Sequence, residues 1–274
     1  MSIYLDDGFS VLLSVYKKEF SHHVRSSLTS IWDHQSLKPN QIVLVKDGDL
    51  TAELDCEIDK WKDKLGDVFT IVSLNDNVGL ASALNYGLQY CKYDLVARMD
   101  TDDMAMPERF DLQVAFMKAN EDIVVSSGYI EEWNADFSAK MSSRVLPLDN
   151  NNIVKFAKMR SPISHPACIF RKSVIIEVGG YPTIYPEDHL LWVRVLLAGY
   201  KLANIPQVLL RMRTGEDFIS RRGYNFLKGE LASYRIMYQL KFITVGQYLK
   251  ACVFRTLVRL PPPKLKVLLY KYMR

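Results

Sequence analysis

The sequence predicts an α/β fold in which a mostly parallel β-sheet is flanked by helices. Over the first 130 residues, short apolar runs of strand length alternate with segments whose apolar residues recur at helical spacing. This β-α-β alternation is typical of a doubly wound sheet, because parallel neighbours need a crossover connection between them. With 274 residues, 49% of them hydrophobic, the chain is long enough for one large domain of this kind and a C-terminal helical extension.

The expected elements follow from these two kinds of pattern. Apolar runs predict strands at residues 9–15, 41–45, 69–74, 93–99 and 123–129, with shorter candidates at 169–170 and 208–212. Apolar residues at intervals of three and four predict helices that begin at Ser21, with this serine as the cap, and that span 50–65, 80–90 and 107–118. Pro107 opens the last of these, because a first helical turn tolerates proline.

Positive charge is concentrated at the C-terminus. Residues 221–274 contain twelve lysines and arginines but one acid, Glu230, whereas the whole chain carries a net charge of only +4. From residue 246 onward basic and apolar side chains interleave, which is typical of an amphipathic segment on an anionic membrane surface. A helix buried against the domain is one alternative; nucleic-acid binding is another, but no recognised module supports it. We expect a globular domain over residues 1–222 and a basic amphipathic helical tail over 223–274 whose partner is an anionic membrane.

Three further features bear on the compartment. Asp6 and Asp7 stand where a signal peptide carries basic residues, and the apolar run that ends at Val15 is short for such a peptide. No stretch of about 20 apolar residues predicts a transmembrane helix. The four cysteines are scattered and form no C-x-x-C pair, which favours reduced thiols over a zinc site or a disulfide framework. The expected location is the cytoplasm, at the inner face of the plasma membrane.

Four polar side chains follow four successive predicted strands at the points where these strands end. They are Tyr16, Asp47, Asn77 and Asp100. Because the carboxyl ends of parallel strands meet at one edge of a sheet, and ligands bind outside that edge, we expect these side chains to share one site. Gly79 would begin a helix whose first amides favour an anion. Ordinary strand–helix packing explains this glycine equally well.

The densest group of acids follows the fourth predicted strand. The string Arg98-Met99-Asp100-Thr101-Asp102-Asp103 places three carboxylates within four residues. Hard oxygen ligands of this kind suit Mg²⁺ or Mn²⁺, which commonly share their sites with substrate phosphates. An acidic turn that faces solvent is the alternative, and the alignment of Asp100 with Asp47 argues against it. We predict a divalent-cation site at Asp100, Asp102 and Asp103.

Six short motifs, in one order, resemble those of the family 2 glycosyltransferases, which have the GT-A fold, a Rossmann-like sheet. They are VYKKE, VLVKDG, NVGLASALNYGL, MDTDD, HPACIFRKSVIIEVGGY and PEDHLLWVRV, and they extend from Val15 to Val195. The resemblance implies inverting transfer of a sugar from a nucleotide-diphosphate donor. It places nucleotide binding in residues 1–105 and acceptor binding in residues 106–222. The members that the chain resembles are those of bacterial O-antigen and exopolysaccharide synthesis.

On the donor side, a basic motif of the family closes over the diphosphate, since guanidinium groups pair well with phosphate oxygens. The candidates here are Arg211, Arg213, Arg221 and Arg222, with a solvated basic face as the alternative. The histidine that commonly accompanies this motif is missing. The donor-binding residues that the resemblance implies are Tyr16, Asp47 at the nucleobase, Asn77, Gly79, Asn85, Arg98, Asp100, Arg221 and Arg222.

On the acceptor side, PEDHLLWVRV places Asp188 at the position of the catalytic base, with Glu187 as an orienting or acceptor contact. On physical grounds alone, two acids after Pro186 equally suit the first turn of a helix. His165 and Trp192 are the expected acceptor contacts; a hydrogen-bonded structural histidine and a packed tryptophan are the alternatives. The Q-x-x-R-W signature of processive members is absent, which argues for one sugar per encounter.

The sequence therefore predicts an inverting, non-processive glycosyltransferase at a membrane surface, extending a lipid-linked saccharide in surface polysaccharide biosynthesis. Two other functions stay open. A sugar-1-phosphate nucleotidyltransferase would carry a Gly-rich loop after the first strand, and SVYKKE contains no glycine. A non-catalytic sugar-nucleotide-binding protein would be expected to lose Asp188 or the acidic pair Asp100 and Asp102, and all three are present.

Overall fold

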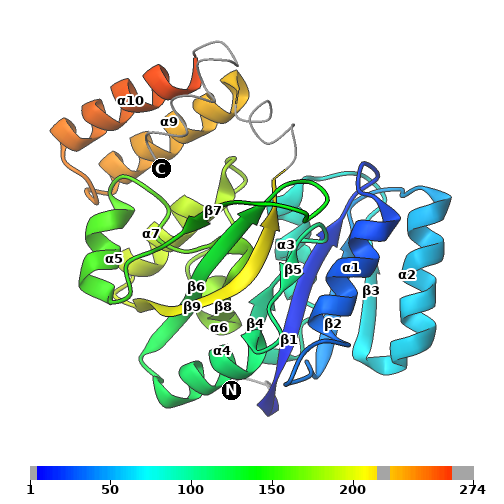
Figure 1. The fold of residues 1–274 in the computed structure, drawn as a ribbon. Coiled ribbons are helices and arrows are strands. Elements are labelled where there is room, and N and C mark those ends of the chain that lie inside the picture. The colour runs from blue at the N-terminus through cyan, green and yellow to red at the C-terminus, as the bar shows by residue number, and fades with distance from the viewer. Residues whose placement is uncertain (1–4, 215–222, 261–274) are drawn as a thin grey trace.

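The computed structural model describes residues 5–214 and 223–260 (Figure 1). Its first half alternates strands with helices, as the sequence predicts. The elements are β1 (Leu5–Val15), α1 (Ser21–Ile31), β2 (Gln41–Lys46), α2 (Ala52–Leu65), β3 (Phe69–Ser73), α3 (Leu80–Leu88) and β4 (Tyr93–Arg98), with a short 3-10 turn at Gly66–Val68.

The second half is less regular. It contains β5 (Met104–Ala105), α4 (Arg109–Ala119), β6 (Ile123–Trp133), β7 (Lys140–Arg144), α5 (Asn150–Ala157), a 3-10 turn at His165–Ala167, β8 (Ile169–Arg171), α6 (Lys172–Glu177), α7 (Glu187–Leu197) and β9 (Lys201–Arg213). Two helices, α9 (Tyr224–Gln239) and α10 (Val245–Arg259), follow at the C-terminal end.

One sheet joins the strands of the described residues, in the order β3-β2-β1-β4-β8-β6-β9-β5, with β7 beside β6. The pairs β1–β2, β1–β4, β2–β3 and β6–β9 are parallel, which confirms the predicted mostly parallel sheet. Strand β8 lies antiparallel between β4 and β6, so β6 and β9 run in the same direction as β1. The carboxyl ends of six strands therefore meet at one edge of the sheet, which is where ligands of such sheets bind.

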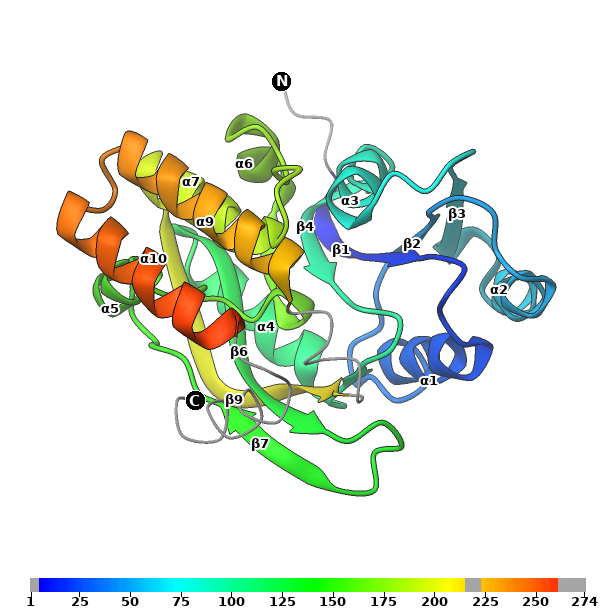
Figure 2. The same ribbon diagram turned by 90° about the horizontal axis from the view of Figure 1, so that it is seen from above.

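Both faces of the sheet are buried, which explains why its strands are continuous apolar runs. Val11 and Leu13 of β1 pack with α1, α2 and α4, whereas Leu12 points the other way and packs with α3, α6 and α7. Figure 2 shows α1 and α2 on one side of β1 and β2 and α3 on the other. Helix α3 lies so close to the sheet that a Cβ at Gly87 would meet Leu12 and Val45 at 2.6 and 2.5 Å.

Several predicted helix starts differ from the observed ones by one or two residues. Phe20 is the N-cap of α1, so Ser21 is its first residue, and the Glu19 carboxylate accepts a hydrogen bond from the Phe20 amide. Helix α2 is capped by Thr51, whose hydroxyl accepts from the Leu54 amide at 3.3 Å. Helix α4 begins two residues after Pro107.

Helices α9 and α10 form a hairpin that packs on the rest of the domain. Leu190 and Val193 of α7 share a buried cluster with Tyr234 and Met237 of α9 and with Ala251 of α10. Helix α10 begins with a capping box, in which Thr244 and Gln247 satisfy each other's backbone amides. Among the described helices, none combines the length and the apolar character needed to cross a bilayer.

Candidate active site

The four polar residues that follow β1 to β4 lie at one edge of the sheet, as predicted. These strands are parallel neighbours in the order β3-β2-β1-β4, so Asn77, Asp47, Tyr16 and Asp100 form a row across it. Tyr16 is exposed, and its carbonyl accepts a hydrogen bond from the Glu19 amide, which closes the turn after β1. The prediction of a shared edge is therefore confirmed.

Asp47 is buried and holds the start of α3. Its carboxylate accepts hydrogen bonds from the backbone amides of Val78, at 2.7 Å, and Gly79, at 3.1 Å, and from the Asn77 side chain at 3.0 Å. Gly79 has a φ of +83°, a conformation that favours glycine, while a Cβ there would have open space. Gly79 is thus needed for its backbone conformation. The nucleobase contact of Asp47 stays a prediction.

Asn85 has a different position from the one expected for a donor contact. Its side-chain nitrogen donates to the carbonyl of Tyr181 and its oxygen accepts from the amide of Tyr181, both at 2.8 Å. The amide group is therefore engaged with the backbone of the loop before α7. Asn85 ties α3 to the half of the domain that carries Glu187 and Asp188, and its donor contact stays a prediction.

The acids after β4 form one compact cluster. One carboxylate oxygen of each of Asp100, Asp102 and Asp103 lies within 4.8 Å of the others. The Oδ2 atom of Asp103 is buried and has no hydrogen-bond partner within the described residues. Burial, and then the charges of Asp100 and Glu19, raise the pKa of Asp102 to about 7. A divalent cation would offset the repulsion among these carboxylates and provide a partner for the Asp103 oxygen, so the cluster has the chemistry of a cation site.

Two buried arginines fix the position of this cluster. Arg98 is buried and forms an ion pair with Asp100. Arg109, also buried, donates from Nη2 to the Arg98 carbonyl at 2.6 Å. On the other side, the Ser27 hydroxyl of α1 donates to the Asp100 carbonyl at 2.8 Å. The predicted donor residue Arg98 therefore orients Asp100 from beneath the surface.

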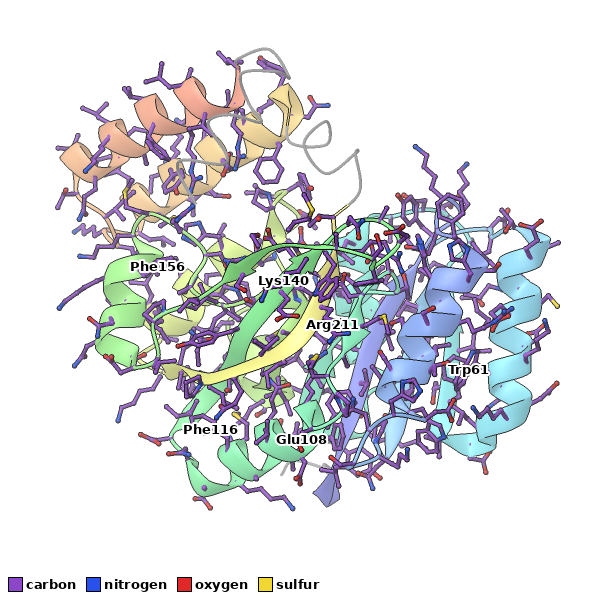
Figure 3. The ribbon with its side chains drawn as sticks, in the orientation of Figure 1. Trp61, Glu108, Phe116, Lys140, Phe156 and Arg211 are labelled. Carbon is purple, nitrogen blue, oxygen red and sulfur yellow. The ribbon has the colours of Figure 1, made fainter. Side chains whose placement is uncertain are left out.

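The arginines after residue 210 differ in their surroundings. Arg213, at the carboxyl end of β9, donates from its amide to Asp103 Oδ1 at 2.8 Å and from Nε to the Asp102 carbonyl at 2.9 Å. Arg211 instead lies over the Trp133 ring, with its Nε 3.6 Å from Oε2 of Glu131. The Lys140 ammonium forms an ion pair with the same glutamate, at 2.8 Å from Oε1 (Figure 3). Of Arg211 and Arg213, Arg213 is thus the one beside the cluster. The predicted donor residues Arg221 and Arg222 lie outside the described residues.

A second pair of acids begins α7. Asp188 is partly exposed, and its Oδ2 accepts a hydrogen bond from the Ser161 hydroxyl at 2.7 Å. Glu187 is buried, with one carboxylate oxygen 3.6 Å from Nδ1 of His165. Burial, and then the charge of Asp188, raise the pKa of Glu187 to about 7. Two adjacent carboxyl groups therefore differ in character: Glu187 is a buried acid, whereas Asp188 is an oriented carboxylate open to solvent.

His165 and Trp192 lie behind these acids. Burial lowers the pKa of His165 well below its ordinary value, so the ring is neutral, and its Nε2 lies 3.3 Å from the Tyr181 hydroxyl. Trp192 has no exposed surface and packs edge-on against His165, with ring centroids 6.1 Å apart. The expectation that Trp192 touches an acceptor does not fit this burial, because its position in α7 directs it into the core. It supports His165 instead.

The two acidic groups are close enough to interact electrostatically. The charges of both Asp188 and Asp100 raise the pKa of Glu187, and the charge of Arg98 acts on Glu187 and His165. These interactions join the end of β4 to the start of α7. The sheet edge therefore carries a cluster of acids with the chemistry of a cation site on one side and the hydrogen-bonded Asp188 on the other.

Three contributors were not predicted from the sequence. Glu19 lies near enough to Asp102 to raise its pKa, and it accepts from His23 and the Phe20 amide. Ser161 orients Asp188 from 27 residues away. Tyr181 bonds to His165 through its hydroxyl and to Asn85 through its backbone. Glu19 belongs to the VYKKE motif, which was a usable signal, whereas the contact of Ser161 depends on chain packing.

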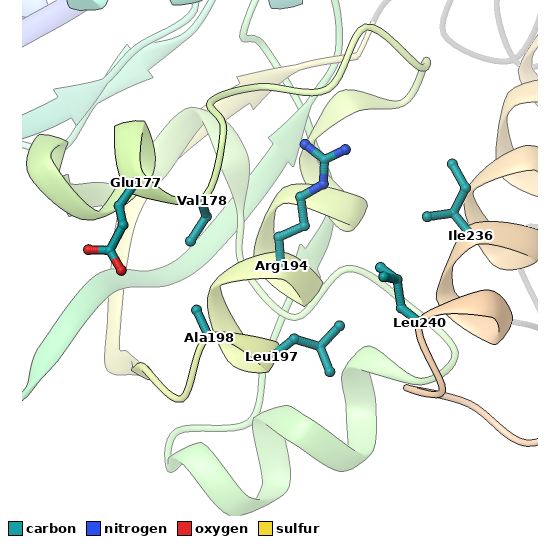
Figure 4. Close-up of a pocket in the computed structure, with 7 residues that line it drawn as sticks. All are labelled: Glu177, Val178, Arg194, Leu197, Ala198, Ile236 and Leu240. Carbon is teal, nitrogen blue, oxygen red and sulfur yellow. The ribbon is translucent and has the colours of Figure 1, made fainter.

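A shallow apolar hollow of about 380 Å³ lies elsewhere, between α6, α7 and α9 (Figure 4). Its acid, Glu177, accepts a hydrogen bond from the Tyr200 hydroxyl at 2.7 Å. No residue of the two acidic groups lines it, and it offers no ligand set for a cation. We therefore place the active site at the sheet edge. The hollow is lined by Glu177, Val178, Arg194, Leu197, Ala198, Ile236 and Leu240.

Burial of Glu187 predicts a pH-dependent contribution to stability. The folded protein keeps a proton on this side chain up to about pH 7, whereas the unfolded chain releases it near the ordinary pKa of 4.5. The stability associated with protonated Glu187 is thus complete below pH 4.5 and is lost as pH rises through 7. We expect Glu187→Gln, which cannot ionise, to gain on wild type by up to about 3 kcal/mol between pH 4.5 and pH 8. Denaturant unfolding without added cation measures this, and a difference that stays constant across the range would contradict it.

Comparisons with known proteins agree with this geometry. The model of the glycosyl transferase family 2 matches residues 10–179. The chain is 40% identical to the amylovoran biosynthesis glycosyltransferase AmsE of Erwinia amylovora, over 96% of this chain and 98% of that protein. It is 34% identical to an Escherichia coli UDP-Gal:alpha-D-GlcNAc-diphosphoundecaprenol beta-1,3-galactosyltransferase, over 96% and 95% of the two chains.

Two solved structures share the fold. TarS 1–349 of S. aureus in complex with UDP-GlcNAc superposes with a TM-score of 0.67 at 18% identity, covering 91% of this chain and 72% of that one. The mannosyltransferase PcManGT of Pyrobaculum calidifontis, in complex with GDP-Man and Mn²⁺, superposes with a TM-score of 0.66 at 14% identity. The superposition covers 98% of this chain and 80% of that one. From its motifs, its sheet edge and these relatives, we conclude that the chain belongs to glycosyl transferase family 2 and is a glycosyltransferase.

Proposed function

We propose that this glycosyltransferase moves one sugar per encounter from a nucleoside-diphosphate sugar to a saccharide hydroxyl, with inversion at the anomeric carbon. The observation that carries the proposal is the meeting of two acidic groups with different properties at one sheet edge. Asp100, Asp102 and Asp103 form a cation-binding cluster, and Asp188 is a separate carboxylate held by Ser161.

The donor side is the edge formed by β1 to β4. Asp100, Asp102 and Asp103 would hold Mn²⁺ or Mg²⁺, which would neutralise the diphosphate as it leaves. Arg98 fixes Asp100, and Arg213 fixes the backbone and side chain of the next two acids, so the cluster is oriented before substrate arrives. Tyr16 is exposed beside it and offers an aromatic surface to the nucleoside.

The acceptor side is the start of α7. The Asp188 carboxylate takes the proton of the acceptor hydroxyl, and a lone pair of that oxygen forms the new bond to the anomeric carbon. The bond from this carbon to the diphosphate oxygen breaks, and its electrons leave with the diphosphate. Because attack comes from the face opposite the leaving group, the anomeric configuration is inverted. Ser161 points the Asp188 carboxylate, while the raised pKa of Glu187 keeps its carboxyl protonated below about pH 7.

The nature of the acceptor is suggested by relatives. The similar Escherichia coli enzyme is named for an acceptor linked to diphosphoundecaprenol, and the Erwinia amylovora relative is named for amylovoran biosynthesis. We therefore assign this chain to surface polysaccharide assembly on a lipid-linked saccharide. A lipid-linked acceptor requires work at a membrane, which supports our assignment of the enzyme to the cytoplasmic face of the plasma membrane.

A screen of nucleotide sugars by thermal unfolding tests the donor assignment. A ligand that binds only the folded state raises the unfolding temperature. We expect one nucleoside-diphosphate sugar to stabilise the protein when Mn²⁺ or Mg²⁺ is present and to have little effect when the cation is chelated. Incubation of that donor without acceptor should also release some free sugar, which distinguishes a live transferase from a non-catalytic binding protein. Stabilisation that is unaffected by chelation would contradict the cation assignment.

A further inference from the structure

Helix α10 exposes apolar side chains where a surface helix ordinarily exposes charged ones. We call the set Val245, Leu249, Val253, Leu257 and Leu260 the α10 stripe. Each of its side chains is between 56% and 65% exposed. At 3.6 residues per turn, Leu249, Val253 and Leu257 lie opposite the buried residues Ala251 and Val258. The helix is therefore apolar on both sides, whereas a helix that covers a core usually has one polar face.

The arginines of α10 point inward. Arg259 forms two hydrogen bonds with the buried Glu230 of α9, at 2.8 and 3.0 Å. Arg255 donates from Nη2 to the Met159 carbonyl at 2.7 Å, and its Nε lies 3.4 Å from Glu230. In the described part of the predicted amphipathic tail, two of the basic side chains therefore face the domain and the apolar ones face outward. The reason is that Glu230, the single acid of the region, attracts both arginines into the hairpin.

Positively charged side chains near the α10 stripe favour some binding partners over others. Lys250 lies beside it on α10 and is exposed; Arg235 of α9 and Lys241 of the connecting turn are exposed as well. The sequence that follows α10, residues 261–274, adds Lys264, Lys266, Lys271 and Arg274 without an acid. Pairing of two copies through the stripe would bring their Lys250 side chains close together, which is unfavourable. Apolar side chains bordered by lysine and arginine are instead suited to the boundary of an anionic bilayer.

The helix pair is also fixed to the acceptor side of the site. The Phe226 ring of α9 packs edge-on against Tyr185, two residues before Glu187, with centroids 5.1 Å apart. The Tyr234 hydroxyl donates to the Met159 carbonyl at 2.6 Å, two residues before Ser161, which holds Asp188. Figure 1 shows α9 and α10 side by side at the end of the domain that carries α7. A surface that receives α10 therefore lies next to the point where the acceptor enters.

We propose that α10 docks the enzyme on an anionic bilayer by inserting the α10 stripe into the interface, with Lys250 against the headgroups. Docking in this way would present the acceptor side of the site to lipid-linked saccharides. That consequence rests on the proposed function, whereas the docking itself does not. Apolar insertion supplies binding that salt does not screen, so attachment persists in part at high ionic strength.

Vesicle sedimentation of the full chain tests the proposal. We expect binding to vesicles of mixed phosphatidylglycerol and phosphatidylcholine, and little binding to phosphatidylcholine alone. The variant Leu249→Gln/Val253→Gln/Leu257→Gln should bind anionic vesicles at least about tenfold more weakly, because three inserted side chains become polar. A matched variant changes three exposed apolar residues elsewhere, Met141→Gln/Val145→Gln/Ile176→Gln, and should bind like wild type.

Measurements of sugar transfer and of oligomeric state distinguish a failure of the docking proposal from a failure of the proposed function. Transfer to a soluble acceptor should stay within about twofold of wild type in both triple variants, since none of these residues lies at the acidic groups. Deletion of α10 is a poorer test, because it would leave Glu230 buried without its two arginines. Equal vesicle binding by the α10 variant and wild type would overturn the proposal, and so would a wild-type dimer that the α10 variant abolishes. Vesicle binding that depends on the stripe, without sugar transfer, would instead overturn the proposed function alone.

Discussion

Replacing Asp188 with asparagine is expected to lower turnover by about 10²- to 10⁴-fold while donor affinity stays near wild type. Asparagine keeps the shape of the side chain and can still accept the hydrogen bond from Ser161, but it cannot take the proton of the acceptor hydroxyl. In the proposed function the donor is bound by the cluster at Asp100, so its affinity should not depend on Asp188. Steady-state transfer assays and calorimetry with donor and Mn²⁺ measure the two quantities separately.

A graded companion variant distinguishes a base from a structural carboxylate. Ser161→Ala leaves the Asp188 carboxylate in place but removes the hydroxyl that orients it, so it should slow transfer by much less than Asp188→Asn does. The product of the wild-type enzyme should have the anomeric configuration opposite to that of the donor, as NMR of the product shows directly. Near-normal turnover in Asp188→Asn would refute the base assignment. A retained anomeric configuration would refute direct displacement.

The second large effect is expected at Asp102, where removal of the carboxylate should lower donor affinity and raise stability without cation. Asp102→Ala should lower donor affinity in Mn²⁺ on the order of tenfold or more and remove its dependence on the cation, because the cluster loses a ligand. In the absence of cation, Asp102→Asn should unfold at a higher temperature than wild type at pH 8. At that pH the wild-type side chain is ionised beside Asp100 and Glu19, and its raised pKa shows that this ionisation is unfavourable in the folded protein.

The control for this prediction is Asp59→Asn, which neutralises an exposed acid on α2. It should change neither the cation dependence of donor binding nor the unfolding temperature appreciably. Calorimetry with and without Mn²⁺, and thermal unfolding in chelator, provide the measurements. Donor affinity of Asp102→Ala that still rises on addition of Mn²⁺ would exclude Asp102 as a ligand, whatever its effect on stability.

Features that depend on local order along the chain were predictable from the sequence. Strands buried on both faces are recognisable as apolar runs, and parallel neighbours must end at the same edge of a sheet. The row of Tyr16, Asp47, Asn77 and Asp100 followed from these two rules. The acidic cluster followed as well, because Asp100, Asp102 and Asp103 are so close in sequence that one turn brings them together.

Features that join distant segments were decided only by the tertiary structure. Strand β8 separates β4 from β6, which directs β9 so that Arg213 reaches Asp102 and Asp103 across 110 residues. Ser161 meets Asp188 because the segment after α5 packs against the start of α7. No periodicity records such contacts, since each depends on how two elements pack and not on the spacing within either one.

Helix α10 shows the same division most clearly. Its sequence determined that basic and apolar residues would interleave along a helix that a capping box begins. It did not determine which set faces outward, because that depends on Glu230, which lies on another helix. A buried carboxylate requires a charged partner, so the hairpin turns Arg255 and Arg259 inward and leaves the leucines and valines of the α10 stripe exposed to solvent.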